Sequence, residues 1–227
     1  MGTEAARHVP STGNEIMSKV LCSTLAIIAM VIAPGSYSAD TTEHPRGEPM
    51  EVLKQHVERG LAVLTDPEFA DLEEHDVGFN AQREQLCAVA QEMFDPYLFS
   101  VLSLGANWKR FSEDERDAFV SEFATYLCRY YLSRLQTWYS NESVEYIDQT
   151  YVNDARANVD VAVIWNNTRL PITIRMAWRH GEWRAFDAVV SGVSAVMIFR
   201  SQFASFLKKG APADLIEDLR QRGAANG

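Results

Sequence analysis

The sequence predicts an α+β fold in which one four-stranded antiparallel sheet packs against several helices. Apolar residues recur with a helical period of about 3.6 over residues 50–140 and then alternate over residues 142–190. The helical pattern returns over residues 192–222. The turns between the alternating segments are too short for crossover helices, so the strands must follow one another as an antiparallel meander.

The N-terminal segment predicts export. Residues 20–33 form an uncharged apolar run that follows Lys19, and the small residues Ser36 and Ser38 precede a candidate cleavage point. The run is short for a membrane span, which favours a cleaved signal peptide. An uncleaved anchor is the alternative. Met17 is a second candidate start. The chain is thereby divided into a signal peptide over residues 1–38, a flexible mature N-terminus over 39–49 and a single domain over 50–222.

Four helices are expected before the sheet, over residues 50–64, 79–94, 96–104 and 112–139. Asp95 precedes Pro96 as a natural N-cap, and Gly105 ends the same helix. Ser112 and Glu115 form a capping box at the start of the longest helix. Aromatic residues line one face of that helix, and core packing explains them more simply than ligand contact does.

The four strands are expected over residues 143–152, 159–167, 171–178 and 182–190. Turn residues separate them at Asn153-Asp154, Asn166-Asn167 and His180-Gly181. A helix over residues 193–209 follows the sheet and is stopped by Gly210. A last short helix is expected over residues 212–222.

Two charged residues fall where the pattern predicts a buried position. If Arg179 pairs with Glu182 across the last hairpin, Ile174 faces Asp187 on the apolar side of the sheet. Arg200 lies on the inward stripe of the following helix. An isolated buried charge costs several kcal/mol, so Asp187 and Arg200 are expected either to bind each other or to take helix-end and backbone partners. A ligand contact by Arg200 and a catalytic role for Asp187 are the alternatives.

Composition and motifs argue against several function classes. The net charge is −10 and basic residues do not cluster along the sequence, which argues against nucleic acid as a partner. No nucleophile elbow, HExxH spacing, phosphate loop or dinucleotide fingerprint occurs, so we expect no catalytic residue, no metal site and no cofactor. Cys87 and Cys128 are the only cysteines of the predicted mature chain. Export would allow them to pair, but the sequence leaves the pairing open.

Two stretches stand out, "FDPYLFSVLSLGANW" with the long helix after it, and "GEWRAFDAVVSGVSAVMIFRSQF". With them the sequence resembles the toluene-tolerance (MlaC) family of periplasmic phospholipid-binding proteins, from about Glu51 to Leu219. In the second stretch, six residues occupy the places expected in that family: Trp183, Asp187, Gly192, Ser194, Arg200 and Phe203.

The resemblance implies an apolar cavity between the sheet and the helices that shelters phospholipid acyl chains. It also implies a non-enzymatic periplasmic carrier, with an inner-membrane ABC transporter complex and an outer-membrane lipoprotein complex as partners and a role in outer-membrane lipid asymmetry. Judged by the face on which each residue should lie, the expected lining residues are Phe94, Leu98, Leu102, Phe123, Tyr130, Val163, Trp165, Ile174, Met176 and Val196. The alternatives are a carrier of a hopanoid or other apolar lipid, a secreted α+β enzyme using Asp187, and an interaction protein without a cavity.

Overall fold

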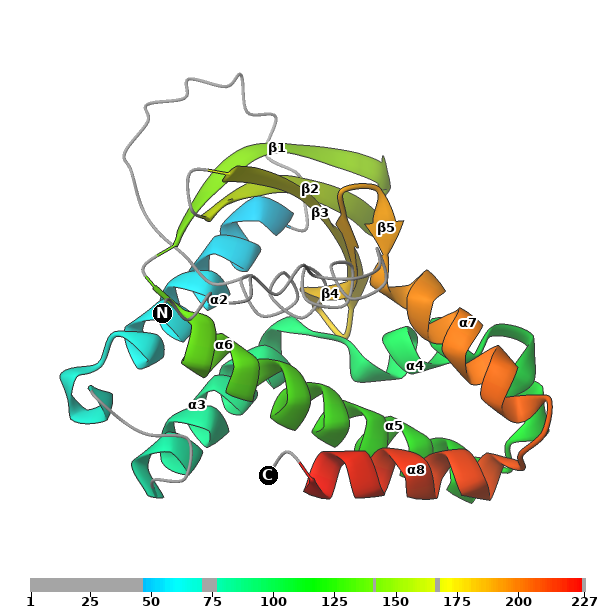
Figure 1. Ribbon diagram of the computed structural model, residues 1–227. Coiled ribbons are helices and arrows are strands. Elements are labelled where there is room, and N and C mark those ends of the chain that lie inside the picture. Colours follow the sequence, from blue (N-terminus) through cyan, green and yellow to red (C-terminus); the bar gives the residue numbers. More distant parts are fainter. Residues whose placement is uncertain (1–46, 71–76, 141, 166–167, 226–227) are drawn as a thin grey trace, which may run out of the picture.

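The computed structural model describes residues 47–70, 77–140, 142–165 and 168–225. One curved antiparallel sheet arches over α2, and the remaining helices form a second layer beneath it (Figure 1). The predicted α+β class is therefore confirmed. The predicted signal peptide, most of the predicted mature N-terminus and the predicted Asn166-Asn167 turn lie outside the described residues.

The helices before the sheet follow the predicted order. Their bounds are α2 Pro49–Leu64, α3 Val77–Met93, α4 Pro96–Leu104, α5 Glu113–Leu127 and α6 Ser133–Trp138, with 3₁₀ turns η1 Pro67–Phe69 and η2 Gly105–Arg110. A π-helical segment, η3 (Cys128–Leu132), joins α5 to α6 where a single helix was predicted. The predicted caps are confirmed, because Asp95 accepts a hydrogen bond from the backbone N–H of Leu98 and Ser112 forms a capping box with Glu115.

The sheet has the order β1-β2-β3-β4-β5. Its strands are β1 Ser143–Asn153, β2 Arg156–Trp165, β3 Thr168–Arg179, β4 Glu182–Val190 and β5 Val193–Ser194. The four predicted strands form the predicted meander, and the two-residue β5 adds a fifth. His180 and Gly181 turn the β3–β4 hairpin, both with positive φ.

The predicted β3–β4 register holds only at the hairpin end. Arg179 pairs with Glu182, as expected. A bulge at Arg175/Met176 then shifts the register, so Asp187 pairs with Arg175 and not with Ile174. The predicted Ile174–Asp187 pair is wrong because a bulge opposes two residues of one strand to one residue of the other.

Two helices follow the sheet, α7 Ala195–Leu207 and α8 Pro212–Ala224. In Figure 1, α8 lies along α5, while α7 descends from the edge of the sheet and packs against α4. On α7, Phe199 is buried on the inward face, whereas Met197 is 54% exposed. No helix in the described ranges is long and apolar enough to cross a membrane.

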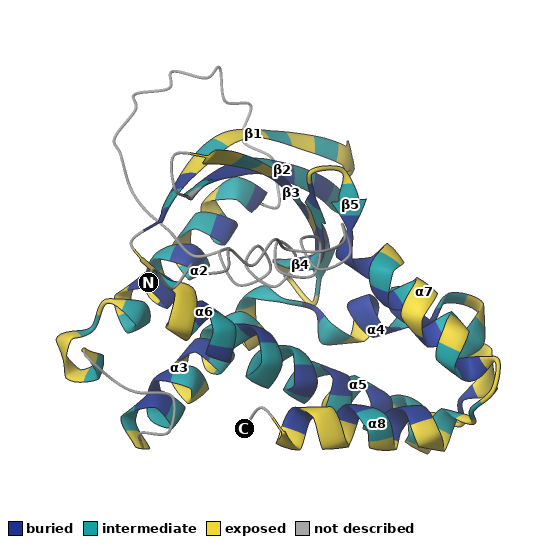
Figure 2. Cartoon of the chain, in the orientation of Figure 1, coloured by how far each residue is buried: buried dark blue, intermediate teal, exposed yellow. Residues whose placement is uncertain are grey.

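Buried residues form two hydrophobic clusters, and both lie on inward faces in Figure 2. The sheet cluster is mainly aliphatic and joins α2 to the concave face of the strands, through residues such as Leu53, Val57, Val159, Ile174 and Met176. The aromatic cluster lies among α4, α5, α7 and α8, and its centre consists of Phe99, Phe119, Phe123, Phe199 and Phe203. Phe94 packs against both clusters and marks the boundary between them.

Candidate functional site

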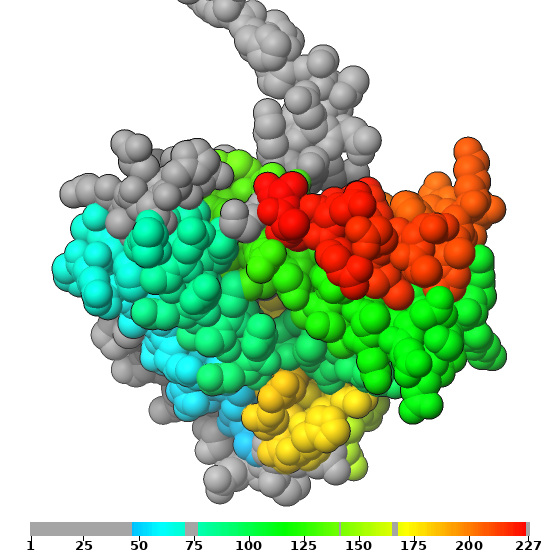
Figure 3. All heavy atoms as spheres, turned by 90° about the horizontal axis from the view of Figure 1, so that it is seen from below, coloured from blue at the N-terminus to red at the C-terminus, as the bar shows by residue number. Residues whose placement is uncertain are grey.

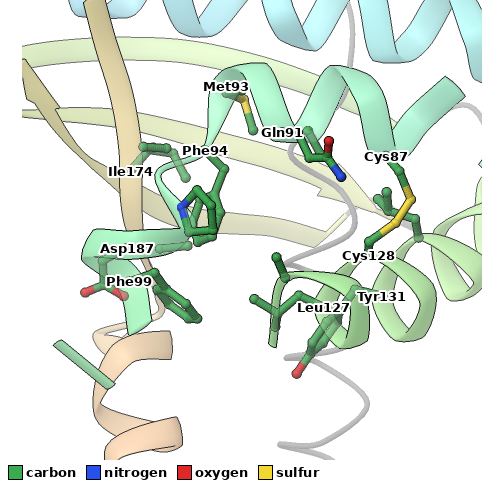
Figure 4. A pocket seen from close by; sticks show the side chains of 16 residues that line it. Cys87, Gln91, Met93, Phe94, Phe99, Leu127, Cys128, Tyr131, Ile174 and Asp187 are labelled. Carbon is green, nitrogen blue, oxygen red and sulfur yellow. A yellow bond between two sulfur atoms is a disulfide. The ribbon is translucent and has the colours of Figure 1, made fainter. Parts of the chain in front are cut away.

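An apolar cavity of about 130 Å³ lies where the two clusters meet. Its walls come from α3, the start of α4, α5, η3, β3 and β4 (Figure 4). On the underside of the molecule, Figure 3 shows a narrow opening between α3 (teal) and α5 (green). The lining residues are Cys87, Ala90, Gln91, Met93, Phe94, Pro96, Phe99, Ala124, Leu127, Cys128, Tyr131, Leu132, Ile174, Ala185, Asp187 and Ala188.

Most of this wall offers no group for chemistry. Gln91, Tyr131 and Asp187 are the polar side chains among the lining residues, apart from the disulfide. Among the described residues, no three His, Cys, Asp or Glu side chains lie close enough together to hold a metal ion. A wall of this composition favours the shelter of an apolar molecule, because each methylene removed from water gains about 0.8 kcal/mol.

A disulfide forms one end of the cavity. Cys87 of α3 is bonded to Cys128, the first residue of η3, across 41 residues of sequence and a Cα–Cα distance of 5.6 Å. The pairing that the sequence left open is therefore present. It fixes α3 to the π-helical segment, so these two walls are held together covalently (Figure 4).

Asp187 lines the opposite end of the cavity (Figure 4), and both oxygens of its carboxylate accept hydrogen bonds from the protein. Oδ2 accepts hydrogen bonds from Nη1 of Arg175 at 3.0 Å and from Oγ of Ser194 at 2.7 Å. Oδ1 accepts from the backbone N–H of Val196 at 3.0 Å, in the first turn of α7. The side chain is only 1% exposed. Asp187 thus ties two strands to the N-terminus of α7, where the helix dipole also favours a negative charge.

Arg200 binds the end of α4 and not Asp187. Its Nε and Nη2 donate to the carbonyl oxygen of Leu102 at 2.8 and 2.6 Å, near the C-terminal end of α4. Gly105 permits this approach, because a Cβ at that position would lie 3.2 Å from Nε. The direct pair between Asp187 and Arg200, one of the two expected arrangements, is wrong. The other arrangement is confirmed for Arg200, which binds a helix-end carbonyl, and for Asp187 at the backbone N–H of Val196. Arg175 is the charged partner of Asp187, and neither arrangement named it.

The other residues of the C-terminal motif also have structural contacts. Trp183 is 1% exposed and its Nε1 donates to the carbonyl of Gly47 at 3.3 Å. Ser194 caps α7 by accepting from the N–H of Met197. Gly192 has a φ of +85° in the turn between β4 and β5, and Phe203 lies in the aromatic cluster.

The structure brings two of the ten predicted lining residues, Phe94 and Ile174, to the cavity. Six of the others are packed into the two clusters: Leu102, Phe123, Tyr130, Val163, Met176 and Val196. Leu98 is buried in α4, and the side chain of Trp165 lies outside the described part of the structure.

Sequence reasoning missed the α3 wall and the whole of the wall formed by α5 and η3. A signal was available for the second, since Ala124, Leu127, Cys128 and Tyr131 recur at helical spacing. The prediction instead chose the larger aromatic side chains on the adjacent face, Phe123 and Tyr130. Those aromatic residues fill the core, as the simpler interpretation had it.

The family model described as "MlaC protein" matches residues 62–221 of this chain. The chain belongs to the MlaC family. The match covers the cavity walls, the disulfide and both charged residues discussed above.

Two individual proteins are similar to this chain. The curated "Intermembrane phospholipid transport system binding protein MlaC" of Haemophilus influenzae is 28% identical over 123 residues, which is 52% of this chain and 57% of the relative. A solved structure of a phospholipid-binding protein from Ralstonia solanacearum, in complex with a phospholipid, aligns with a TM-score of 0.67 at 20% identity. That alignment covers 79% of this chain and 98% of the other, and it shows a shared fold.

Proposed function

We propose that this MlaC-family chain is a periplasmic phospholipid carrier whose acyl-chain site is the cavity between α3, α5, η3 and the sheet. The single observation that carries the proposal is the nearly uninterrupted apolar lining at the meeting point of two separate clusters. The names of the similar proteins support phospholipid as the cargo. A two-chain lipid with some 30 methylenes needs shelter of roughly 24 kcal/mol to cross water.

The size of the cavity requires the walls to separate when a lipid enters. Sites for small molecules occupy about 300–1,000 Å³, and the cavity measures about 130 Å³. The disulfide keeps α3 and η3 together, so the separation occurs between these helices and the sheet residues Ile174, Ala185 and Ala188. A carrier of this kind should bind a lipid about as strongly as a membrane holds it. Much tighter binding would prevent release.

The proposal includes a location and partners. The uncharged run at residues 20–33 supports export through a signal peptide ending near residue 38, and a disulfide is consistent with an oxidising compartment. An inner-membrane ABC transporter complex and an outer-membrane lipoprotein complex are the proposed donor and acceptor. The name of the Haemophilus relative, an intermembrane transport binding protein, supports this assignment.

A catalytic role for Asp187 receives no support from its surroundings. A general acid or base must lie within hydrogen-bonding reach of the proton that it transfers, beside a nucleophile or a water-activating partner. Both carboxylate oxygens of Asp187 accept hydrogen bonds within the protein. The contacts instead favour a structural role at the junction of β3, β4 and α7.

Lipid extraction and mass spectrometry of protein purified from the periplasm without detergent test the proposal. We expect a stoichiometric two-chain phospholipid. A polycyclic or isoprenoid lipid in its place would keep the carrier function and change the cargo. Protein that is free of lipid, and stays so after incubation with phospholipid vesicles, would contradict the proposed function.

A further inference from the structure

The disulfide joins two walls of the cavity at a place that solvent can reach. Cys87 and Cys128 both line the cavity, and both are half-buried. Cys128 directly follows α5, and the surface of the molecule opens between α3 and α5 (Figure 3). Because thiol–disulfide exchange requires direct access to a sulfur atom, a bond in this position can be reduced while the protein stays folded.

The half of α3 that borders the cavity is held loosely by its other contacts. Every residue from 87 to 93 is half-buried or exposed, although this segment supplies four of the lining residues. Glu92 forms an ion pair with Arg59 of α2, and both side chains are about half exposed. An exposed pair of this kind contributes little stability, and it holds α3 to α2 and not to η3. The disulfide is therefore the strongest link between this half of α3 and η3.

Both ends of α3 are fixed without the disulfide. Near its start, Nε2 of Gln136 in α6 donates to Oε1 of Gln82 at 2.9 Å. Just after its end, the backbone N–H of Asp95 donates to the carbonyl oxygen of Ala185 at 2.8 Å. The disulfide lies between these two anchors, so its loss would release the middle of the helix and leave the fold connected.

We propose that the Cys87–Cys128 disulfide is a redox switch that controls how fast lipid leaves the cavity. An external dithiol reduces the bond, residues 87–93 then separate from η3, and the lipid exchanges faster. The inference rests on the proposed function and adds regulation of the same site.

The reaction is a thiol–disulfide exchange. A thiolate of the dithiol attacks one sulfur of the disulfide, the S–S bond breaks, and a mixed disulfide forms. The second thiol of the reagent then displaces the protein sulfur and closes a disulfide within the reagent. The protein gains two electrons and two protons as the thiols of Cys87 and Cys128, and the dithiol loses the same number. The reverse exchange with an oxidised reagent restores the bond.

The cavity is small enough for this bond to limit exchange. Its volume is about 130 Å³, so the walls must separate before a lipid enters or leaves. In the oxidised protein, the helical walls can separate only from the sheet. Reduction permits a second separation, between α3 and η3. Since Phe119 and Phe123 hold α5 in the aromatic cluster, the moving part is α3.

Lipid transfer in the two redox states tests the switch. The protein is loaded with phosphatidylglycerol, and its transfer to phosphatidylcholine vesicles is followed with and without dithiothreitol. Maleimide labelling and intact mass show whether Cys87 and Cys128 are reduced. We expect dithiothreitol to reduce the bond in the folded protein and to raise the transfer rate at least several-fold. Reoxidation with oxidised glutathione should return the rate to its starting value.

Two variants separate the switch from a general loss of stability. C87S/C128S should transfer lipid at the fast rate with or without dithiothreitol. Phe119→Ala keeps the disulfide but leaves a void among buried rings, so it destabilises the fold away from the lining residues. Its lower stability is verified by its melting temperature, and it should keep the slow transfer of the oxidised wild type.

The outcomes distinguish this inference from the proposed function. A bond that dithiothreitol leaves intact in the folded protein, or a reduced protein with an unchanged transfer rate, overturns the switch and leaves the carrier function standing. Fast transfer by oxidised Phe119→Ala also overturns it, because lost stability would then explain the effect. A wild type that takes up no lipid in either redox state overturns both proposals.

Discussion

The aromatic cluster and the cavity lie side by side, and both are apolar. Aromatic rings fill the cluster, whereas smaller side chains leave open space in the cavity. Within the aromatic cluster, the rings of Phe99, Phe119, Phe123, Phe199 and Phe203 lie 5.0–5.7 Å apart and each is at most 5% exposed. The cavity wall, one helical face away, is made largely of small or flexible side chains. These include Ala90, Ala124, Ala185, Ala188, Met93 and Leu127.

The difference separates close packing from cavity lining on two faces of one helix. On α5, Phe123 points into interlocked rings, while Ala124 and Leu127 border open space. Aromatic pairs add about 0.5–1.5 kcal/mol each beyond their buried area, so the cluster resists deformation. Among the described lining residues, ring pairs occur only at Phe94, Phe99 and Tyr131. The aliphatic part of the wall has no such pairs, so it can move without separating the rings of the aromatic cluster.

Truncating one residue on each face of α5 should give the largest change in the free energy of unfolding. Phe123→Ala should lower the free energy of unfolding by about 3–5 kcal/mol, since it leaves a void among fully buried rings. Leu127→Ala should cost about 2 kcal/mol, because one side of Leu127 already borders the cavity. Urea unfolding of the two variants measures both. Equal costs would show that the two faces of α5 are packed alike.

Breaking the disulfide should have the next largest effect. Closing a loop of 41 residues corresponds to about 4 kcal/mol in the chain-entropy model, and measured values are typically about 2–4 kcal/mol. Thermal unfolding with and without reductant measures the loss, and Cys87→Ser/Cys128→Ser serves as the control that reductant no longer affects. A wild type whose melting temperature ignores reductant would mean that the bond does not constrain the unfolded chain.

Asp187→Asn should destabilise the protein without removing lipid. The amide weakens charge-assisted hydrogen bonds to Arg175, Ser194 and Val196, for a loss of about 2–3 kcal/mol. Glu145→Gln, at an exposed ion pair, should cost no more than about 1 kcal/mol. Denaturant titration and lipid content are measured on the same samples. Lost lipid at unchanged stability would assign Asp187 to the binding site and not to the scaffold.

Ala124→Phe should change stability least and lipid binding most. The added ring enters existing space, so the free energy of unfolding should change by about 1 kcal/mol or less. Bound phospholipid, counted by native mass spectrometry, should fall at least several-fold. Ala88→Phe is the matched control, because Ala88 lies on the exposed side of α3. If both variants kept their lipid, the acyl chains would have to lie elsewhere.

Local patterns predicted the long helices and the four main strands of this fold, but not β5 or the π-helical segment η3. The switch from helical to alternating periodicity located the four strands, and Asp95, Ser112 and Gly105 located helix ends. The register failed beyond Arg175 because a bulge consists of one extra residue whose position leaves no trace in the alternation of polar and apolar residues. That single residue moved Asp187 from Ile174 to Arg175.

The cavity was harder to predict than the fold. Which face of α3 or α5 borders open space depends on how the helices are rotated against one another, and periodicity shows only that a face is buried. The π-helical segment at Cys128–Leu132 also changes the phase of the helix, which alters the side chains that reach the cavity.

Photo-cross-linking with a phospholipid that carries a diazirine near the end of one acyl chain tests the central claim most directly. The account predicts that the modified peptides come from residues 87–94 and 124–132, the two helical walls joined by the disulfide, and from β4 near Ala185 and Ala188. Cross-links on the convex face of the sheet or on α8, with none on these segments, would contradict an acyl-chain site between the two clusters.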